Sequence, residues 1–168
     1  EYGGASAPAP CEAARDADFV FCCVGNDDDV RSVVRGESGA LAGMKKGVIL
    51  VDHTTASAIL ARELDARARE LGLGFLDAPV SGGQAGAQNG QLGVMVGGDP
   101  ATFARAKPVL DLYAKSCALI GPAGSGQLCK MVNQICVAGV IQGLAEGLNF
   151  GQHAGLDMEK VLSVISQG

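Results

Sequence analysis

Three short apolar runs, none of which alternates with polar residues, place the strongest constraint on how this chain folds. They span residues 18–24, 47–52 and 74–80. Continuous apolar runs of this length are typical of strands that are covered on both faces. Between the second and third runs, residues 57–71 carry apolar side chains at helical spacing and stop before Gly72, a common helix terminator. This order predicts a β-α-β unit and therefore a parallel sheet.

The flanking segments extend this alternation of strands and helices. Residues 91–98 and 116–121 are two further strand candidates. Asp99 as the N-cap and Pro100 at the first helical position predict a helix between them. The remaining helix candidates are residues 6–17, which Ser6 is expected to cap, and a crossover at residues 29–34 and 41–44. The predicted fold class is α/β, with a partial doubly wound, Rossmann-type parallel sheet.

Residues 126–153 form a long apolar stretch that differs in composition from the segments before it. As a helix it extends about 40 Å, at about 1.5 Å per residue. Because it is apolar on almost all sides, other helices must cover it, yet only the short segment 158–165 follows. We therefore expect the start of an all-helical C-terminal domain, in a fragment of a larger protein that forms homo-oligomers. The alternative is a complete small α/β domain with one long helix laid across a face.

Composition and charge exclude several classes of function. The chain has a net charge of −5 and no run of Lys or Arg, so it offers no basic face to nucleic acid. Residues 131–145 form an uncharged, largely apolar stretch that is too short for a membrane span. The six cysteines lie in apolar runs without a CxxC spacing, which favours buried, reduced thiols and predicts no metal site. We expect a cytoplasmic protein, or one of the mitochondrial matrix in a eukaryote.

Several other charged or imidazole side chains have a structural interpretation. The three acids at 27–29 lie near a predicted helix start, so we expect them to stabilise the helix through its dipole and not to bind a metal. His53 and His153 follow a strand and end a helix, which is typical of surface or capping roles. Glu146 is expected to pair locally within the long helix. Two pairs on helix 57–71 are four residues apart and are expected to form ion pairs: Glu63 with Arg67, and Asp65 with Arg69.

The stretch DAPVSGGQAGAQNGQLGVMVGG, residues 77–98, places seven glycines between two predicted strands, as in a pliable loop. Ser81, Gly82 and Gly83 follow a strand end, where parallel sheets present ligand-binding groups. Glycines let backbone N–H groups approach an anion and the hydroxyl adds a donor, so this corner suits a carboxylate. On this motif alone, a flexible turn without a ligand is the alternative.

A second candidate site lies in residues 121–134, GPAGSGQLCKMVNQ, where glycines lead into the long helix. Lys130, Asn133 and Gln134 are spaced i, i+3 and i+4, so they share one helix face. A desolvated lysine is suited to exchange a proton with a substrate near neutral pH, and an amide can hold a substrate hydroxyl. The alternative is that Lys130 reaches solvent while the two amides bond to nearby backbone.

These two segments, followed by AEGLNFGQHAGLD, resemble in order and separation the β-hydroxyacid dehydrogenase family of the 3-hydroxyisobutyrate dehydrogenase and tartronate semialdehyde reductase type. The resemblance covers essentially all 168 residues. It implies an oxidoreductase that transfers a hydride between NAD or NADP and a small β-hydroxy acid. It also implies a partial dinucleotide-binding domain at residues 1–122 and the start of a helical substrate and dimerisation domain at residues 123–168.

The resemblance assigns roles to particular residues. On the substrate side, Ser81, Gly82 and Gly83 match the motif that grips the carboxylate, and Lys130 matches the catalytic acid/base. Asn133 and Gln134 stand where the family has amides that orient the substrate. On the cofactor side, the matching positions near the nucleotide are Val24, Gly25, Asp29 and Thr55.

The chain also departs from the family pattern. It contains no GxGxxG turn to seat the pyrophosphate, and Val24-Gly25 replaces a common Leu-Pro. A second lysine of the family is expected beyond Gly168. We therefore expect the isolated chain to bind dinucleotide poorly and to be inactive. Two other functions stay open: a 6-phosphogluconate-type dehydrogenase, and a non-catalytic binding module, which the presence of Lys130 disfavours.

Overall fold

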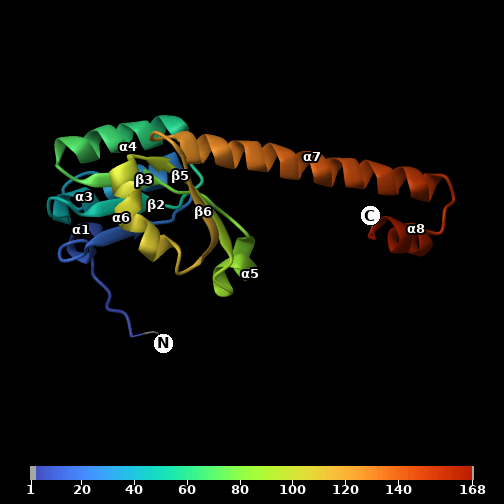
Figure 1. Ribbon diagram of the computed structural model, residues 1–168, viewed down its shortest axis with the longest axis horizontal. Helices are drawn as coiled ribbons and strands as arrows, with labels where there is room; N and C mark the ends of the chain where they lie inside the picture. Colours follow the sequence, from blue (N-terminus) through green and yellow to red (C-terminus); the bar gives the residue numbers. More distant parts are fainter. Residues whose placement is uncertain (1–2, 168) are drawn as a thin grey trace. The chain divides into compact units, whose positions relative to one another are not determined.

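The predicted apolar runs form three neighbouring strands in the computed structural model, which describes residues 3–167 (Figure 1). Strands β1 (Phe19–Cys22), β2 (Ile49–Asp52) and β3 (Gly74–Asp77) pair side by side in parallel. Helix α4 (Ala58–Glu70) connects β2 to β3. The predicted β-α-β unit is confirmed.

The second half of the sheet is antiparallel to the first. Strand β5 (Leu92–Gly98) pairs antiparallel with β3 and with the short β4 (Val80–Ser81), and β6 (Ala114–Gly121) pairs parallel with β5. The sheet is therefore mixed, and the prediction of a wholly parallel sheet is wrong for this half. The reason is the short connection after β3, which reverses the chain through β4 and the small helix α5 (Gly83–Gln88) instead of a long crossover. The α/β class itself is confirmed.

This topology brings the chain back to the carboxyl end of β3. Because β6 is parallel to β5, it ends where β5 ends, and Gly97 of β5 pairs with both Asp77 and Gly121. Helix α7 (Ser125–His153) starts four residues after Gly121. The first turn of α7 therefore begins beside the strand ends.

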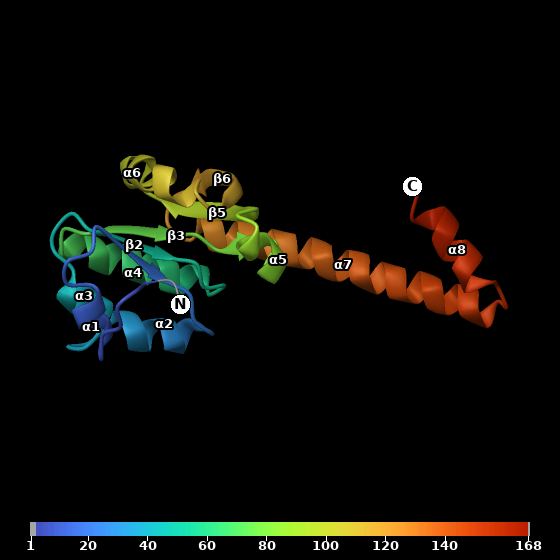
Figure 2. The same cartoon turned by 90° about the horizontal axis from the view of Figure 1, so that it is seen from below.

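Helices cover both faces of the sheet (Figure 2). The α4 face is shared with α1 (Pro10–Ala13), α2 (Asp27–Val34) and α3 (Ala40–Gly43), and the opposite face is covered by α6 (Pro100–Leu110). Successive β2 residues point to opposite faces, so Leu50 packs with the first group while Ile49 and Val51 pack with the second. All three are fully buried, which explains why the run is apolar without alternation.

One of the two predicted helix caps is present, since Asp99 Oδ2 accepts a hydrogen bond from the Thr102 N–H over 2.9 Å. Ser57, which begins the predicted helix 57–71, also caps its helix and accepts from the Leu60 N–H over 3.0 Å. The prediction for Ser6 is wrong. Helix α1 starts at Pro10, and the preceding Ala9 provides no side-chain cap. Proline has no backbone N–H, so the first position of the helix has no donor that a cap would have to satisfy.

The ion pairs on α4 differ in part from the expected i,i+4 set. Asp65 and Arg69 pair at 2.9 Å, as predicted. Glu63 instead pairs with Arg31 and Arg35 of α2, and Arg67 pairs with Glu70, so the prediction for Glu63 and Arg67 is wrong. Glu63 faces α2, where two guanidinium groups are within reach, and a contact between helices replaces one along the helix.

The six cysteines are free thiols with different surroundings. Cys22 is buried against the α4 face, as predicted, and burial raises the pKa of its thiol to about 12. Cys23 and Cys136 are exposed, so the expectation of buried thiols is wrong for them. Cys23 directly follows the last residue of β1, and its side chain is not covered by the layer that buries Cys22.

The chain divides into two units, residues 1–130 and 131–168. The second unit consists of the rest of α7 and of α8 (Met158–Ile165), which Asp157 caps through the Lys160 N–H at 3.3 Å. Within α7, Gln142 donates to Glu146 over 2.9 Å, which confirms the expected local pairing.

By length and composition α7 is apolar enough to cross a membrane, with a mean hydropathy of 1.4 over its most apolar window. The expectation from residues 131–145 alone underestimated this stretch, because the helix also includes apolar turns on either side of them. Its large apolar side chains, such as Ile135, Val140 and Phe150, are exposed in this chain.

Candidate active site

A hydrogen-bonded threonine joins the carboxyl ends of β1 and β2. The Val24 N–H donates to Thr54 Oγ1 over 3.0 Å, and the Thr54 N–H donates to Asp52 Oδ1 over 2.9 Å. Thr54 is buried, whereas Val24 and Thr55 are exposed. Two residues that the sequence places near the nucleotide, Val24 and Thr55, therefore lie at neighbouring strand ends.

The other two predicted cofactor-side residues, Gly25 and Asp29, flank the start of α2. Asn26 caps this helix, since its Oδ1 accepts from the N–H groups of Asp28 and Asp29 at 2.9 and 3.1 Å. The Asp29 carboxylate lies against Gly25. Three acids occupy the first turn, where they interact favourably with the helix dipole, as predicted.

The predicted carboxylate-binding corner is an ordered turn between β4 and α5. Ser81 ends β4 opposite Gly93, and Gly82 and Gly83 have φ values of +126° and +59°. Such left-handed conformations favour glycine, because a Cβ is strained there. The glycine-rich stretch that we expected to be pliable thus contains a helical turn at Gly83–Gln88.

Asp77, at the carboxyl end of β3, holds the beginning of α7. Its side chain is 0% exposed, and its two oxygens accept from the Gly124 N–H at 2.8 Å and the Gln127 N–H at 2.9 Å. Burial raises the pKa of this carboxyl, and the backbone donors partly offset the effect. The first N–H groups of a helix lack partners within the helix. Asp77 therefore caps α7 from another element.

Two glycines let the backbone of α7 approach this carboxylate. A Cβ on Gly126 would lie 2.6 Å from the Asp77 carbonyl oxygen and 2.9 Å from its Oδ2. A Cβ on Gly97 would lie 2.8 Å from both Asp77 Oδ2 and the Gly126 N. Either side chain would have to displace the backbone of α7 or the Asp77 carboxylate.

Gln127 makes a second connection from the same turn. It is 1% exposed; its Nε2 donates to the Thr54 carbonyl oxygen at 2.7 Å, and its Oε1 accepts from the Ala56 N–H at 3.0 Å. Sequence reasoning singled out neither Asp77 nor Gln127. The sequence did contain a signal for a buried polar role. Each residue is polar and lies between small or apolar neighbours, Asp77 at the end of a strand and Gln127 at the start of the long helix.

Lys130 lies one turn beyond Gln127 and is 8% exposed. The alternative in which its side chain extends into solvent therefore does not describe this structure. Among residues 3–167, none of the ion pairs involves Lys130. A largely buried ammonium without a protein carboxylate is suited to interact with an oxygen atom of a ligand.

Asn133 and Gln134 follow in the same helix but belong to the second unit. The Asn133 Nδ2 donates to Gln134 Oε1 over 3.1 Å, so the two amides pair with each other. This differs from the alternative in which both bond to backbone groups.

His53 is not the surface residue that we expected. It is half-buried, with Nδ1 at 2.6 Å from the Ala78 carbonyl oxygen and Nε2 at 2.8 Å from the Tyr113 hydroxyl. Its ring also stacks on Phe21. Desolvation lowers the pKa of His53, so the neutral imidazole joins β2 to the segment before β6. His153 does cap its helix, through Nδ1 and the Asn149 carbonyl oxygen at 2.9 Å.

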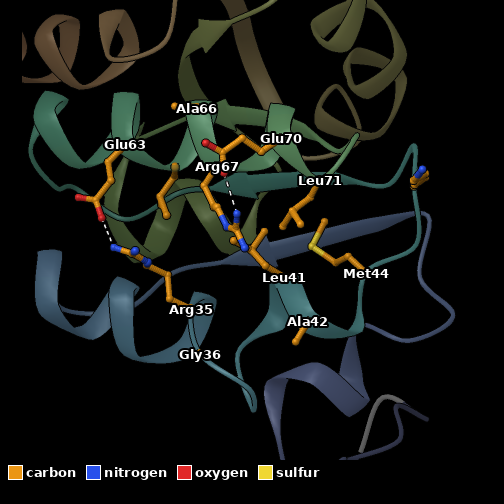
Figure 3. A pocket seen from close by; sticks show the side chains of 12 residues that line it. Arg35, Gly36, Leu41, Ala42, Met44, Glu63, Ala66, Arg67, Glu70 and Leu71 are labelled. Atoms are coloured by element: carbon orange, nitrogen blue, oxygen red, sulfur yellow. Dashed lines mark hydrogen bonds and ion pairs between the residues drawn. The ribbon is translucent and has the colours of Figure 1, made fainter.

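A cavity of about 820 Å³ contains none of the predicted site residues. It lies between α2, α3 and α4, over Leu41 and Leu64 (Figure 3). Figure 3 shows two ion pairs among its charged side chains, Arg35 with Glu63 and Arg67 with Glu70. Among residues 3–167, no cluster of three or more His, Cys, Asp or Glu side chains could hold a metal ion.

The fold and the polar groups at its strand ends define a class, the α/β proteins that bind dinucleotides. Residues 1–121 match the family described as the NAD binding domain of 6-phosphogluconate dehydrogenase. Residues 124–168 match the family described as NAD-binding of NADP-dependent 3-hydroxyisobutyrate dehydrogenase. The chain belongs to the β-hydroxyacid dehydrogenase family, whose nicotinamide cofactor is NAD or NADP.

Individual relatives agree with this assignment. An uncharacterized oxidoreductase of Shewanella frigidimarina is 61% identical over 100% of this chain and 58% of its own length. The 2-hydroxy-3-oxopropionate reductase of Escherichia coli is 39% identical over 99% of this chain and 57% of its own. The structure of Mycobacterium tuberculosis 3-hydroxyisobutyrate dehydrogenase with L-serine superimposes with a TM-score of 0.84 at 35% identity, covering 94% of this chain and 53% of that one. The chain thus spans little more than half the length of these relatives.

Proposed function

We propose that this chain is part of an oxidoreductase that transfers a hydride between NAD or NADP and a small β-hydroxy acid. The observation that carries the proposal is the largely buried Lys130, one turn into a helix whose start Asp77 and Gln127 hold at the strand ends. A lysine in that position can serve as general acid or base for the substrate oxygen.

In this proposal the substrate is bound at both of its ends. Ser81, Gly82 and Gly83 bind the carboxylate with the serine hydroxyl and backbone N–H groups. Lys130 exchanges a proton with the hydroxyl or carbonyl oxygen, and Asn133 with Gln134 orients that oxygen. Holding both ends fixes the reacting carbon, which is the main contribution a protein makes to such a reaction.

The cofactor-side residues fit one end of a dinucleotide. Val24, Gly25 and Thr55 are exposed at neighbouring strand ends and offer backbone groups and a hydroxyl, the donors and acceptors that a nicotinamide ribose can use. Asp29 shapes this edge through its contact with Gly25. When bound, the nicotinamide supplies the hydride acceptor or donor.

The division of the chain by role is also part of the proposal. We assign residues 1–122 to the dinucleotide-binding domain and residues 123–168 to the start of the helical domain, supported by the two family matches on either side of residue 122. The second match covers the apolar α7. We therefore infer that other protein segments of a homo-oligomer cover this helix, and that it does not lie in a lipid membrane. We place the protein in the cytoplasm, or in the mitochondrial matrix of a eukaryote, with no nucleic-acid partner.

The test requires a protein that carries this chain at the full length of its relatives. Reduction of NAD and NADP is followed with 3-hydroxyisobutyrate, glycerate and other small hydroxy acids. We expect turnover with at least one of them, and Lys130→Ala lowers kcat by about a hundredfold or more, the scale for a lost acid/base group. Lys115→Ala, which removes an exposed lysine on β6, is the matched control and stays near wild type. Full activity in Lys130→Ala contradicts the proposal.

A second candidate is a dehydrogenase of the 6-phosphogluconate type. The match of residues 1–121 to the NAD binding domain of 6-phosphogluconate dehydrogenase favours it. Adding 6-phosphogluconate to the same panel separates the two candidates, because a site for a small hydroxy acid turns it over poorly.

A further inference from the structure

Two buried polar side chains tie the first turn of α7 to three strand ends. Asp77 reaches this turn from β3, and Gln127 reaches from it to Thr54 after β2. The Thr54 hydroxyl in turn accepts from the Val24 N–H after β1. A continuous path of hydrogen bonds thus connects the ends of β1, β2 and β3 with the helix that carries Lys130.

We propose that Asp77 and Gln127 are positioning residues that fix Lys130 at the strand ends, an inference that rests on the proposed function. Lys130 lies three residues after Gln127, about 4.5 Å along the helix axis. A displacement of the first turn therefore moves the ammonium with it. The close contacts of Gly97 and Gly126 with the Asp77 carboxylate leave little room for the turn to adjust.

The chemistry of the two side chains favours this role over simple core packing. A buried carboxylate is unfavourable unless donors satisfy it, and an apolar side chain fills the same space without that demand. Asp77 instead matches its two oxygens to the Gly124 and Gln127 N–H groups, in fixed directions. Hydrogen bonds have fixed directions, so they restrict the position of the first helical turn more than apolar contacts do.

Two substitutions remove these bonds while keeping the volume nearly constant. Asp77→Asn replaces one acceptor oxygen by an NH₂ group, which faces a backbone N–H and cannot accept from it. Gln127→Met removes both bonds of the amide side chain and leaves the Thr54 carbonyl and the Ala56 N–H without this partner. If one variant does not fold, the other is judged by the same measurements.

The test is a double-mutant cycle on kcat in the full-length protein. A misplaced catalytic group costs about a hundredfold in rate per ångström, so we expect Asp77→Asn to lower kcat by about ten- to a hundredfold. In a Lys130→Ala background the same substitution has almost no further effect, because its partner is gone. An equal loss in both backgrounds, or no loss in either, overturns the positioning role while the proposed function stands. Full activity of Lys130→Ala alone overturns both.

Amide hydrogen exchange in this chain gives a readout independent of activity. In Asp77→Asn we expect faster exchange of whichever of the Gly124 and Gln127 N–H groups faces the new NH₂ group, because that N–H loses its acceptor. The control is Asp99→Ala, which removes the cap of α6 and speeds exchange at Thr102, with α7 unchanged. Unchanged exchange at the start of α7 in Asp77→Asn contradicts the proposal.

Discussion

Substitution of Gly126 by alanine tests how closely α7 packs on the strand ends. The added Cβ would lie 2.6 Å from the Asp77 carbonyl oxygen and 2.9 Å from its carboxylate, and it would also contact the Met95 carbonyl oxygen. These distances are shorter than van der Waals contact. Since two of the three atoms belong to the backbone of β3 and β5, a side-chain rotation cannot relieve the clash, and the start of α7 must move instead.

The expected loss of stability follows from three contributions. Overpacking of a tight contact costs about 1–3 kcal/mol. A displaced helix start weakens the two hydrogen bonds to Asp77, each worth about 1.5–3 kcal/mol for a charged acceptor, and loss of about half of this energy costs about 2 kcal/mol in total. Alanine recovers about 1 kcal/mol in helix propensity over glycine. The net loss is about 3 kcal/mol, which lowers the unfolding midpoint by about 6–12 °C in a protein of this size.

Thermal unfolding followed by far-ultraviolet circular dichroism measures this effect. Gly139→Ala is the matched control, because Gly139 lies in the same helix and a Cβ there meets no atom within 4 Å. We expect Gly139→Ala to leave the midpoint unchanged or to raise it, from propensity alone. If Gly126→Ala is as stable as Gly139→Ala, the close packing of α7 on Asp77 is refuted.

Three further predictions concern single side chains. Burial raises the pKa of Asp52 above 3.8, so its contribution to stability is lost as the pH rises from 3.8 through the folded-state pKa. In urea titrations, the stability of Asp52→Asn relative to wild type should therefore increase as the pH rises above 3.8. Burial lowers the pKa of His53 below 6.5, so its contribution to stability is lost as the pH falls below 6.5. In the same titrations, the free energy of unfolding of His53→Gln should therefore decrease less than that of wild type as the pH falls below 6.5. In the full-length enzyme, Ser81→Ala should raise the KM for the hydroxy acid about ten- to a hundredfold, the value of a hydrogen bond to a charged group, with a smaller change in kcat.

Local signals in the sequence were sufficient for most elements. Ser57 and Gly72 bracket α4 as expected, because a hydroxyl cap and a terminal glycine act within one turn. The apolar run of β2 was equally clear, since both of its faces are covered. Such signals depend only on neighbours in the chain.

The errors involve contacts between segments that are far apart in the sequence. Glu63 pairs with α2 rather than along its own helix, and no local pattern predicts which helix lies alongside. The direction of β5 depends on whether the chain after Asp77 crosses over or turns back, and a glycine-rich stretch is compatible with both. Asp77 and Gln127 were missed for the same reason, since their partners lie 47 and more residues away.

For the site, the sequence analysis identified residue types and order, and the structure adds the burial of Lys130. The residue types suggested the chemistry of Ser81 and Lys130, and the resemblance then assigned them specific roles. The link between Val24 and Thr54 shows how the predicted cofactor side connects to the helix that carries the lysine.

A crystal structure of the full-length protein with a bound β-hydroxy acid tests the central claim most directly. We predict the carboxylate on Ser81, Gly82 and Gly83, and the hydroxyl oxygen at about 2.6–3.2 Å from Lys130 Nζ, the range for proton transfer. A ligand bound away from both groups, or bound to one with the other too distant to reach it, would contradict the account.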